Sequence, residues 1–423
     1  MKNVIHYKNI DGTSKGFWGL LAFFGAIMLV GLAATYYMEH EGHWVTGMTN
    51  QIVWGVPHVF AVFLIVAASG ALNVASIGSV FGRPKYKALG RLSGLLAITL
   101  LAGGLAVLLL DLGRPDRLII AATYYNFKSI FALNIILYSG FFGLVGVYLW
   151  AMMDRSVTKY YKIAGFFAFI WRLILTTGTG SIFGFLVARE AYDAAIMAPL
   201  FIIMSFSFGM AIYILVLMAG MKGSGRVLGD ETLRLLKNML GVFVASVLYF
   251  VLVYHLTNLY ATQHHGYEAF ILLDGGIYTQ LFWILQIGLG SLVPLGILFH
   301  PRLGKSPQWI GTAAVLVIIG GLAQMYIIII GAQAYPLSIF PDYDIISSSF
   351  SDGIVMSYTP SIYEIALGLM GVAIALAMTQ FAIKVLPFLP ESLADEVIDP
   401  HHMPVEAETS DDVDDAAPAT KSC

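Results

Sequence analysis

One histidine lies inside a stretch of the sequence that is otherwise apolar enough to cross a lipid bilayer. The stretch runs from Gln51 to Ile77, and His58 falls in its first third. An ionisable side chain among hydrocarbon tails is costly unless the protein or a ligand engages it, so it marks a functional site by default. Imidazole can hydrogen-bond or exchange a proton near neutral pH. We therefore expect His58 to carry chemistry.

Polar residues recur on the His58 face of the predicted helix. Positions 58, 62, 65, 69, 73 and 76 fall near one face and read His, Val, Ile, Ser, Asn, Ser. A helix with one wetter side is typical of the wall of an internal cavity. Ser69 and Ser76 fit equally well as helix-packing residues that bond to neighbouring helices or to their own backbone.

A second candidate closes the next apolar run, in the motif Leu-Asp-Leu-Gly-Arg-Pro-Asp-Arg at 110–117. Asp111 is the first charge after about 20 apolar residues, and Gly113 and Pro115 are typical helix-ending residues. A half-desolvated carboxylate next to the Arg114 guanidinium could accept a proton or open a proton path. The alternative is an interfacial salt bridge that only caps the helix.

Two further charged or titratable groups lie within apolar segments. Arg172 is near the middle of its segment and must face the protein interior, on the same helix face as Thr176 and Thr179. It could begin a polar path or serve as a structural arginine bonded to carbonyls. His255 is at a depth similar to that of His58, so the two could be axial ligands of a b-type haem or hydrogen-bond partners of a quinone.

The composition predicts a polytopic membrane protein. Of the 423 residues 58% are hydrophobic and 12% are charged, against about 25% charged in soluble domains. The single cysteine, Cys423, excludes an intrachain disulfide, a thiolate-held iron–sulfur cluster and a CxxCH haem motif. We expect an all-α integral membrane protein with about ten transmembrane helices, in two four-helix bundles plus two peripheral helices. The predicted spans are 16–37, 51–78, 89–110, 128–152, 163–187, 196–219, 238–260, 277–299, 309–333 and 361–386.

Charge predicts the orientation of these spans. Eighteen of the 23 Lys and Arg residues fall on one face, which the positive-inside rule places in the cytoplasm of a bacterial inner membrane. Both termini then lie inside, and His58, Asp111 and His255 lie toward the outer face. We divide the chain into a cytoplasmic arm (1–15), a membrane domain (16–387) and a disordered acidic tail (388–423).

Three motifs resemble the NrfD/polysulfide-reductase family of membrane subunits. They are WGVPHVFAVFLIVAASGALNV at 54–74, LDLGRPDR at 110–117 and YDAAIMAPLF at 192–201. The length, the ten spans and the Thr-Gly-Met before the second span are similar to the DsrP branch, the membrane subunits of DsrMKJOP sulfur-metabolism complexes. The resemblance implies a haem-free quinone-binding anchor. Its implied partners are a periplasmic ferredoxin-like (DsrO-like) iron–sulfur subunit, a multihaem cytochrome c, a cytochrome b and cytoplasmic iron–sulfur subunits.

The resemblance also implies site residues. The quinone-binding histidine of the polysulfide reductase subunit maps onto His58, but the family's asparagine three residues earlier is Gly55 here. The family's tyrosine falls near Thr176 to Gly178, where this sequence has none. Quinone contacts could instead come from Tyr124, Asn134, Tyr138 and His255.

We therefore expect a quinone-reactive subunit of a sulfur-metabolism oxidoreductase complex that is inactive alone, without haem or cluster of its own. His58 would hold the quinone, Asp111 with Arg114 would handle protons, and Arg172 would tune an inner polar path. Partners would attach at acidic outer loops, including 334–360. A haem b subunit (His58, His255) and an ion transporter using Asp111, Arg172 and Glu364 are the alternatives.

Overall fold

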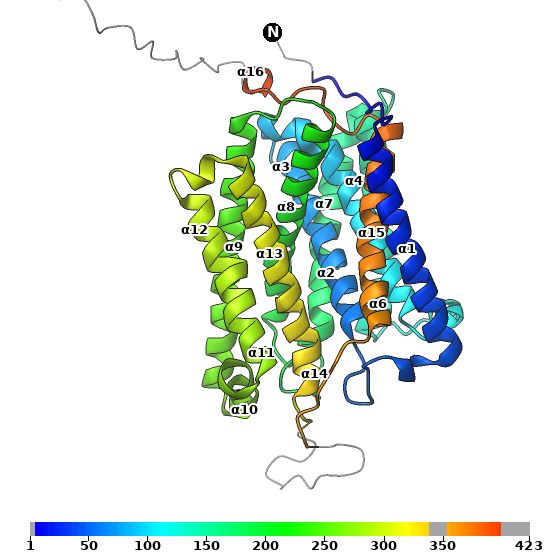
Figure 1. The fold of residues 1–423 in the computed structure, drawn as a ribbon, viewed down its shortest axis with the longest axis vertical. Helices are drawn as coiled ribbons and strands as arrows, with labels where there is room; N and C mark the ends of the chain where they lie inside the picture. The colour runs from blue at the N-terminus through cyan, green and yellow to red at the C-terminus, as the bar shows by residue number, and fades with distance from the viewer. Residues whose placement is uncertain (1–4, 338–352, 399–423) are drawn as a thin grey trace, which may run out of the picture.

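The computed structural model describes residues 5–337 and 353–398 as a helical membrane protein (Figure 1). Ten helices of this part of the chain are long and apolar enough to span a bilayer, which confirms the predicted number. They are Lys15–Glu41, Val56–Ser79, Pro84–Leu110, Ile130–Met153, Thr158–Gly184, Met197–Gly223, Asp230–Tyr260, Ile277–Phe299, Pro307–Ala334 and Ile362–Val385.

Each span comprises one or more helical segments. The α-helices are α1 (Lys15–Glu41), α2 (Val56–Ala71), α3 (Asn73–Ser79), α4 (Gly90–Leu110), α5 (Leu118–Thr123), α6 (Ile130–Met153), α7 (Tyr161–Gly184), α8 (Met197–Gly223), α9 (Asp230–Tyr260), α10 (His265–Ala269), α11 (Ile277–Gln280), α12 (Val293–Phe299), α13 (Pro307–Tyr326), α14 (Ala332–Ala334), α15 (Ile362–Val385) and α16 (Asp395–Ile398). The 3₁₀ turns are η1 (His43–Val45), η2 (Pro84–Leu89), η3 (Pro115–Arg117), η4 (Thr158–Tyr160), η5 (Thr262–His264) and η8 (Leu303–Lys305).

Polar residues set the ends of these apolar helices. The Ser14 hydroxyl accepts a hydrogen bond from the Phe17 amide at the start of α1, and Gly42, with φ of +95°, ends that helix. Ser361 and Glu364 form a capping box at the start of α15, in which each side chain accepts a backbone N–H of the other residue. Between such ends the backbone hydrogen bonds close within each helix, as lipid requires.

The second span is the centre of the bundle, with 89% of its most apolar window buried. It packs mainly against α4, α8 and α15, and also against α7 and α13. In contrast α1 packs along α15 at one edge of the molecule, where only 22% of its window is buried (Figure 1). The predicted division into two four-helix bundles stays a prediction, because α2 packs as closely on α8 as on α4.

Figure 1 shows the described ends of the chain at one end of the bundle, with α10 and α14 at the other. We call these the termini end and the His58 end, because α2 begins beside α14. Three π-helical segments also occur, and the sequence analysis did not predict them. They are η6 (Phe270–Asp274), η7 (Leu281–Leu292) and η9 (Ile327–Gly331).

The C-terminal boundary differs from the predicted one. Phe388, Leu389 and Leu393 are buried, and the backbone around them pairs with both the N-terminal arm and the loop before α9. Lys8 donates to the Leu389 carbonyl, and Leu393 donates to the Val227 carbonyl. The predicted disordered tail therefore begins too early, because residues 388–398 belong to the folded layer. The rest of the predicted tail, 399–423, lies outside the described residues.

Candidate functional site: a cavity beside a buried histidine–aspartate pair

A cavity of about 660 Å³ opens between α2, α4, α6 and α7 at the His58 end, with the segment around α5 at its mouth. Most of its wall is apolar, and a few polar groups converge in it, as in small-molecule sites. The polar and aromatic residues that line it are Trp54, His58, Tyr124, Asn126, Ser129, Phe131, Asn134, Tyr138, Ser139, Thr179 and Phe183.

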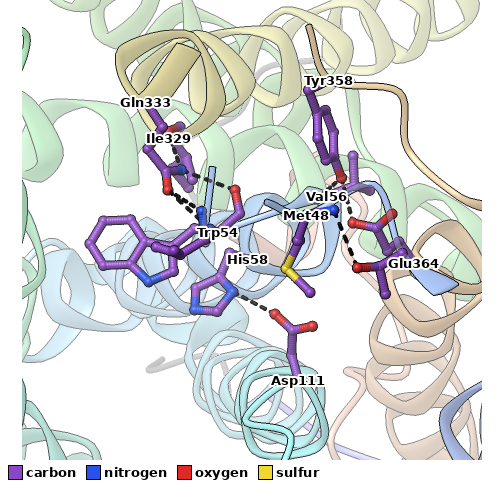
Figure 2. A network of polar contacts seen from close by, with 11 residues as sticks. Met48, Trp54, Val56, His58, Asp111, Ile329, Gln333, Tyr358 and Glu364 are labelled. Atoms are coloured by element: carbon purple, nitrogen blue, oxygen red, sulfur yellow. Dashed lines mark hydrogen bonds and ion pairs between the residues drawn. The ribbon is translucent and has the colours of Figure 1, made fainter. Parts of the chain in front are cut away.

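His58 forms an ion pair with Asp111 in the wall of this cavity. Nδ1 of His58 lies 2.6 Å from Oδ2 of Asp111, and the side chains are 16% and 1% exposed (Figure 2). The Trp54 indole stacks against the imidazole, with ring centroids 5.9 Å apart. Because the carboxylate engages Nδ1, Nε2 is the nitrogen left for a ligand in the cavity.

The residues that lead into α2 have no regular structure of their own and are held by α14. Oε1 of Gln333 accepts hydrogen bonds from the amides of Val53 and Trp54, at 2.9 and 3.0 Å, and Nε2 donates to the Trp54 carbonyl at 3.0 Å (Figure 2). The Arg189 guanidinium donates to the carbonyls of Gln51 and Gln333. This network fixes Trp54 and the first turn of α2, and hence His58.

A buried carboxylate supports the other side of the same segment. Glu364 is fully buried and accepts hydrogen bonds from the Gly47 amide, at 2.8 Å, and from the Tyr358 hydroxyl, at 2.5 Å. The Tyr358 hydroxyl in turn accepts from the Val56 amide at 2.9 Å (Figure 2). Burial, followed by the hydrogen bond to the Glu364 carboxylate, raises the pKa of Tyr358, so its hydroxyl stays a donor.

The structure brings four of the predicted contact residues to one cavity: His58, Tyr124, Asn134 and Tyr138. Tyr124 is 85% exposed at the mouth, whereas Asn134 and Tyr138 are buried. The Asn134 amide already donates to the carbonyls of Ile130 and Gly178, so only its oxygen remains for other partners.

The predicted pairing of Asp111 with Arg114 is wrong. The Arg114 guanidinium instead makes two hydrogen bonds to Asp116, at 3.0 and 3.1 Å, on the surface. Those bonds raise the pKa of Arg114 and lower the pKa of Asp116. Adjacent charges on an exposed turn can pair with each other, which leaves the more buried Asp111 to the imidazole of another helix.

Arg172 faces the interior, as expected, and is 1% exposed. Its guanidinium donates to Oδ1 of Asn73 at 3.0 Å and to the Ser69 carbonyl at 3.4 Å. Two phenylalanine rings, Phe169 and Phe206, lie 4.9 Å from it. Among the described residues no carboxylate forms an ion pair with it, so cation–π contacts and dipoles hold this charge.

His255 lies away from the cavity, so its assignment to the same ligand site is wrong. Its Nδ1 is 2.7 Å from Oε2 of the fully buried Glu268, and Asn258 donates to the other carboxylate oxygen at 2.8 Å. His58 and His255 are thus each engaged by a separate carboxylate, on helices α2 and α9 that both pack against α8. This arrangement does not favour the pair as two ligands of one haem.

Comparisons with known proteins agree with this architecture. Residues 44–336 match the family model described as polysulphide reductase, NrfD. The chain belongs to the NrfD family. The match extends from the turn after α1 to the end of α14, and so includes the cavity, the His58–Asp111 pair and Gln333.

Several relatives of this NrfD-family protein are membrane subunits of redox complexes. It is 26% identical over 93% of its length, and 99% of the relative's, to an Hdr-like menaquinol oxidoreductase integral membrane subunit of Archaeoglobus fulgidus. It is 24% identical over 85% of its length, and 89% of the relative's, to a menaquinone reductase integral membrane subunit of Nitratidesulfovibrio vulgaris. It is also 24% identical, over 68% of its length and 96% of the relative's, to the membrane-family relative named for the polysulfide reductase of Wolinella succinogenes.

The structure accounts for one departure from the family pattern, Gly55. A methyl group on Gly55 would overlap Oε1 of Glu364 and lie 2.7 Å from the Tyr358 hydroxyl. The space that the asparagine side chain would need in this NrfD-family protein is therefore filled by the Glu364–Tyr358 pair. The ligand-facing role expected of that asparagine has no counterpart at this position.

Sequence reasoning missed several residues that build the site. Trp54 had only its aromatic type as a signal, and Gln333, Arg189 and Tyr358 come from segments far from α2 in the sequence. A lone glutamine in an apolar helix, like a buried charge, must find a partner in lipid. Applied to Gln333, that rule would have marked it as a residue with a structural or functional task.

Proposed function

We propose that this protein is the quinone-binding membrane anchor of a multisubunit oxidoreductase. It exchanges electrons between the membrane quinone pool and redox centres of partner subunits. The observation that carries the proposal is the cavity, because it combines an apolar wall with a single imidazole held by a buried carboxylate. The names of its relatives, two of which refer to menaquinol or menaquinone, favour a naphthoquinone.

The cavity fits a quinone head group in size and chemistry. Its volume of about 660 Å³ lies within the range of roughly 300–1,000 Å³ typical of small-molecule sites. Trp54, Phe131 and Phe183 offer flat apolar surfaces to a ring. Nε2 of His58 is placed to hydrogen-bond a carbonyl or hydroxyl oxygen, while Asp111 orients the imidazole and stabilises its charged form. A bound quinone would supply the two-electron chemistry.

The protein is expected to depend on partners for activity. Several relatives are named as subunits of reductases or oxidoreductases, so partner subunits are implied. We assign the His58 end to the outer face of a bacterial inner membrane and the termini end to the cytoplasm, because most cations of the sequence fall at the termini end. An iron–sulfur partner of the ferredoxin type, DsrO-like, would then attach outside, with cytochrome and cytoplasmic iron–sulfur subunits completing a sulfur-metabolism complex.

The transporter alternative lacks a shared site. Asp111, Arg172 and Glu364 each have different partners: His58, Asn73 and Tyr358 respectively. Among the described residues there is no group of three or more His, Cys, Asp or Glu side chains that could hold a metal ion. The favoured function therefore remains quinone chemistry at His58.

Binding of a fluorescent hydroxyquinoline N-oxide, a quinone-site ligand, tests the proposal. Fluorescence quenching should report one saturable site in the purified full-length protein, and His58→Ala should weaken binding by at least about tenfold, the equivalent of one lost hydrogen bond to a charged group. His265→Ala is the matched control, because His265 is exposed and bonds the Leu259 carbonyl away from the cavity. Equal affinity of wild type and His58→Ala would contradict the assignment of His58.

A further inference from the structure

We propose that His43 and Glu39 relay a proton between Asp111 and the aqueous phase at the His58 end. The inference rests on the proposed function, since it concerns the protons that accompany quinol oxidation or quinone reduction. It adds two residues from α1 and η1, which are outside the cavity lining.

Three buried polar atoms without a hydrogen-bond partner gather on the far side of the His58–Asp111 pair. Asp111 uses Oδ2 for His58, while its Oδ1 is buried and unpartnered. Nε2 of His43 and Oε1 of Glu39 are also buried and unpartnered. Only eight such atoms occur in the part of the chain that the structure describes, and three of them belong to this one corner. Buried polar atoms normally have a partner, so water must serve them here.

The backbone around Gly113 brings His43 close to Asp111. Gly113, two residues after Asp111, has φ of +69°, and a methyl group on it would lie 3.3 Å from Nε2 of His43. The imidazole therefore rests on the turn that follows the aspartate. A glycine at this position allows both the left-handed turn and the close approach of the ring.

Packing on both sides of His43 holds it over the pair. Met38 and Val45, which flank it in the sequence, pack with Ala61 and Val107, one turn from His58 and Asp111 respectively. Glu39 lies close enough to Arg114 for its charge to help raise the pKa of that guanidinium. The end of α1 and η1 thus cover Asp111 and carry two further titratable groups from it toward the surface.

These positions give a complete proton route for quinol oxidation. The O–H bond of a quinol hydroxyl breaks as its proton passes to Nε2 of His58, and the Nδ1 proton passes to Oδ2 of Asp111. The electrons leave to a one-electron acceptor of a partner subunit, an iron–sulfur cluster or a haem. A half-turn of the Asp111 carboxyl group about Cβ–Cγ presents the proton to water and His43, and Glu39 takes it on to bulk water. Quinone reduction uses the same groups in reverse.

The test compares variants of the assembled complex, isolated through a tag on this subunit. Reduction of the partner redox centres is followed by stopped-flow absorbance after mixing with a short-chain naphthoquinol. His43→Ala should slow this single turnover by about tenfold or more and increase its solvent deuterium isotope effect, while the affinity for the hydroxyquinoline N-oxide stays unchanged. Added imidazole should restore the rate in His43→Ala. It should not do so in His43→Gln, where the side chain fills the space.

His40→Ala is the matched control, because His40 is exposed on the same helix and stacks on Tyr36 instead of facing Asp111. It should behave as wild type. The relay is overturned if His43→Ala keeps the wild-type rate and isotope effect. It is also overturned if the rate falls together with ligand affinity and without imidazole rescue, which would make His43 a structural support. Failure of the wild-type protein to bind the ligand would instead remove the proposed function itself.

Discussion

The partner of an imidazole determines which of its nitrogens carries a proton. Asp111 is 1% exposed and bonds Nδ1 of His58 at 2.6 Å, so it holds the ring in one orientation and stabilises it when charged. Asp111→Asn keeps the shape of this contact but removes the charge. We expect single-turnover reduction of the partner centres by a naphthoquinol to fall about 100-fold, with a much smaller loss of ligand affinity.

Asp116→Asn is the control for this prediction, because Asp116 lies five residues on and pairs with Arg114 at the surface. It should keep both rate and affinity. If Asp111→Asn turned over like wild type, the carboxylate would be a structural cap alone.

At this scale the sequence indicated which residues matter better than it indicated their partners. His58, Asn134 and Tyr138 were chosen as polar or titratable groups in apolar spans, and the fold places all three at one cavity. Asp111 was assigned to Arg114 because they are neighbours in the sequence. Its partner lies 53 residues away on another helix, and no local pattern reveals such a contact.

At the scale of elements, the short α14 positions the start of α2. Gln333 satisfies the amides of Val53 and Trp54 and the Trp54 carbonyl, so Gln333→Leu should leave these groups unpaired. Each unpaired buried group costs roughly 1–3 kcal/mol. We expect a lower melting temperature in detergent and weaker binding of the hydroxyquinoline N-oxide, because Trp54 and His58 lose their anchor.

The matched control is Gln380→Leu, which removes a buried glutamine that donates to the Phe17 carbonyl near the termini end. It should lower the melting temperature and leave ligand affinity unchanged. Equal losses of affinity in both variants would show that affinity follows global stability and not the local anchor.

Hydrophobic length predicted the spans, because lipid forces an apolar segment of this length to close its own backbone hydrogen bonds. It did not predict the winding inside them. In η7 the helix is π-wound, and there Gly290 meets Gly320 of α13 so closely that a methyl group on either would overlap the other's backbone. Such close approach depends on which helices are neighbours, and hydropathy contains no information about that.

For the whole molecule, the two ends of the chain form a folded layer at the termini end. The sequence predicted a disordered tail from residue 388 on because the segment is acidic and poor in aromatic residues. The few apolar residues at its start decide otherwise, since Phe388, Leu389 and Leu393 are buried against the bundle. Composition averaged over a long segment hides a short anchor at one end of it.

One arginine joins the N-terminal and C-terminal segments in this layer. The Arg226 guanidinium donates to the carbonyls of Lys8 and Asn9 from the N-terminal arm and to those of Leu389 and Pro390 from the C-terminal segment. Hydrogen bonds from a charged group contribute roughly 1.5–3 kcal/mol each, and a change of 1.4 kcal/mol is about tenfold in an equilibrium. Arg226→Ala should therefore speed amide hydrogen exchange at residues 8–10 and 389–393 by at least about tenfold.

Lys222→Ala provides the comparison, because Lys222 is exposed near the end of α8, four residues before Arg226, and is not one of the residues that bond the two segments. It should leave exchange unchanged. Arg226→Ala should also leave binding of the hydroxyquinoline N-oxide unchanged, because the cavity lies at the other end of the bundle and is anchored by α14 and α15. A coupled loss of affinity would mean that the layer at the termini end and the His58 cavity move as one unit, and the two ends would then communicate through the central helix α2.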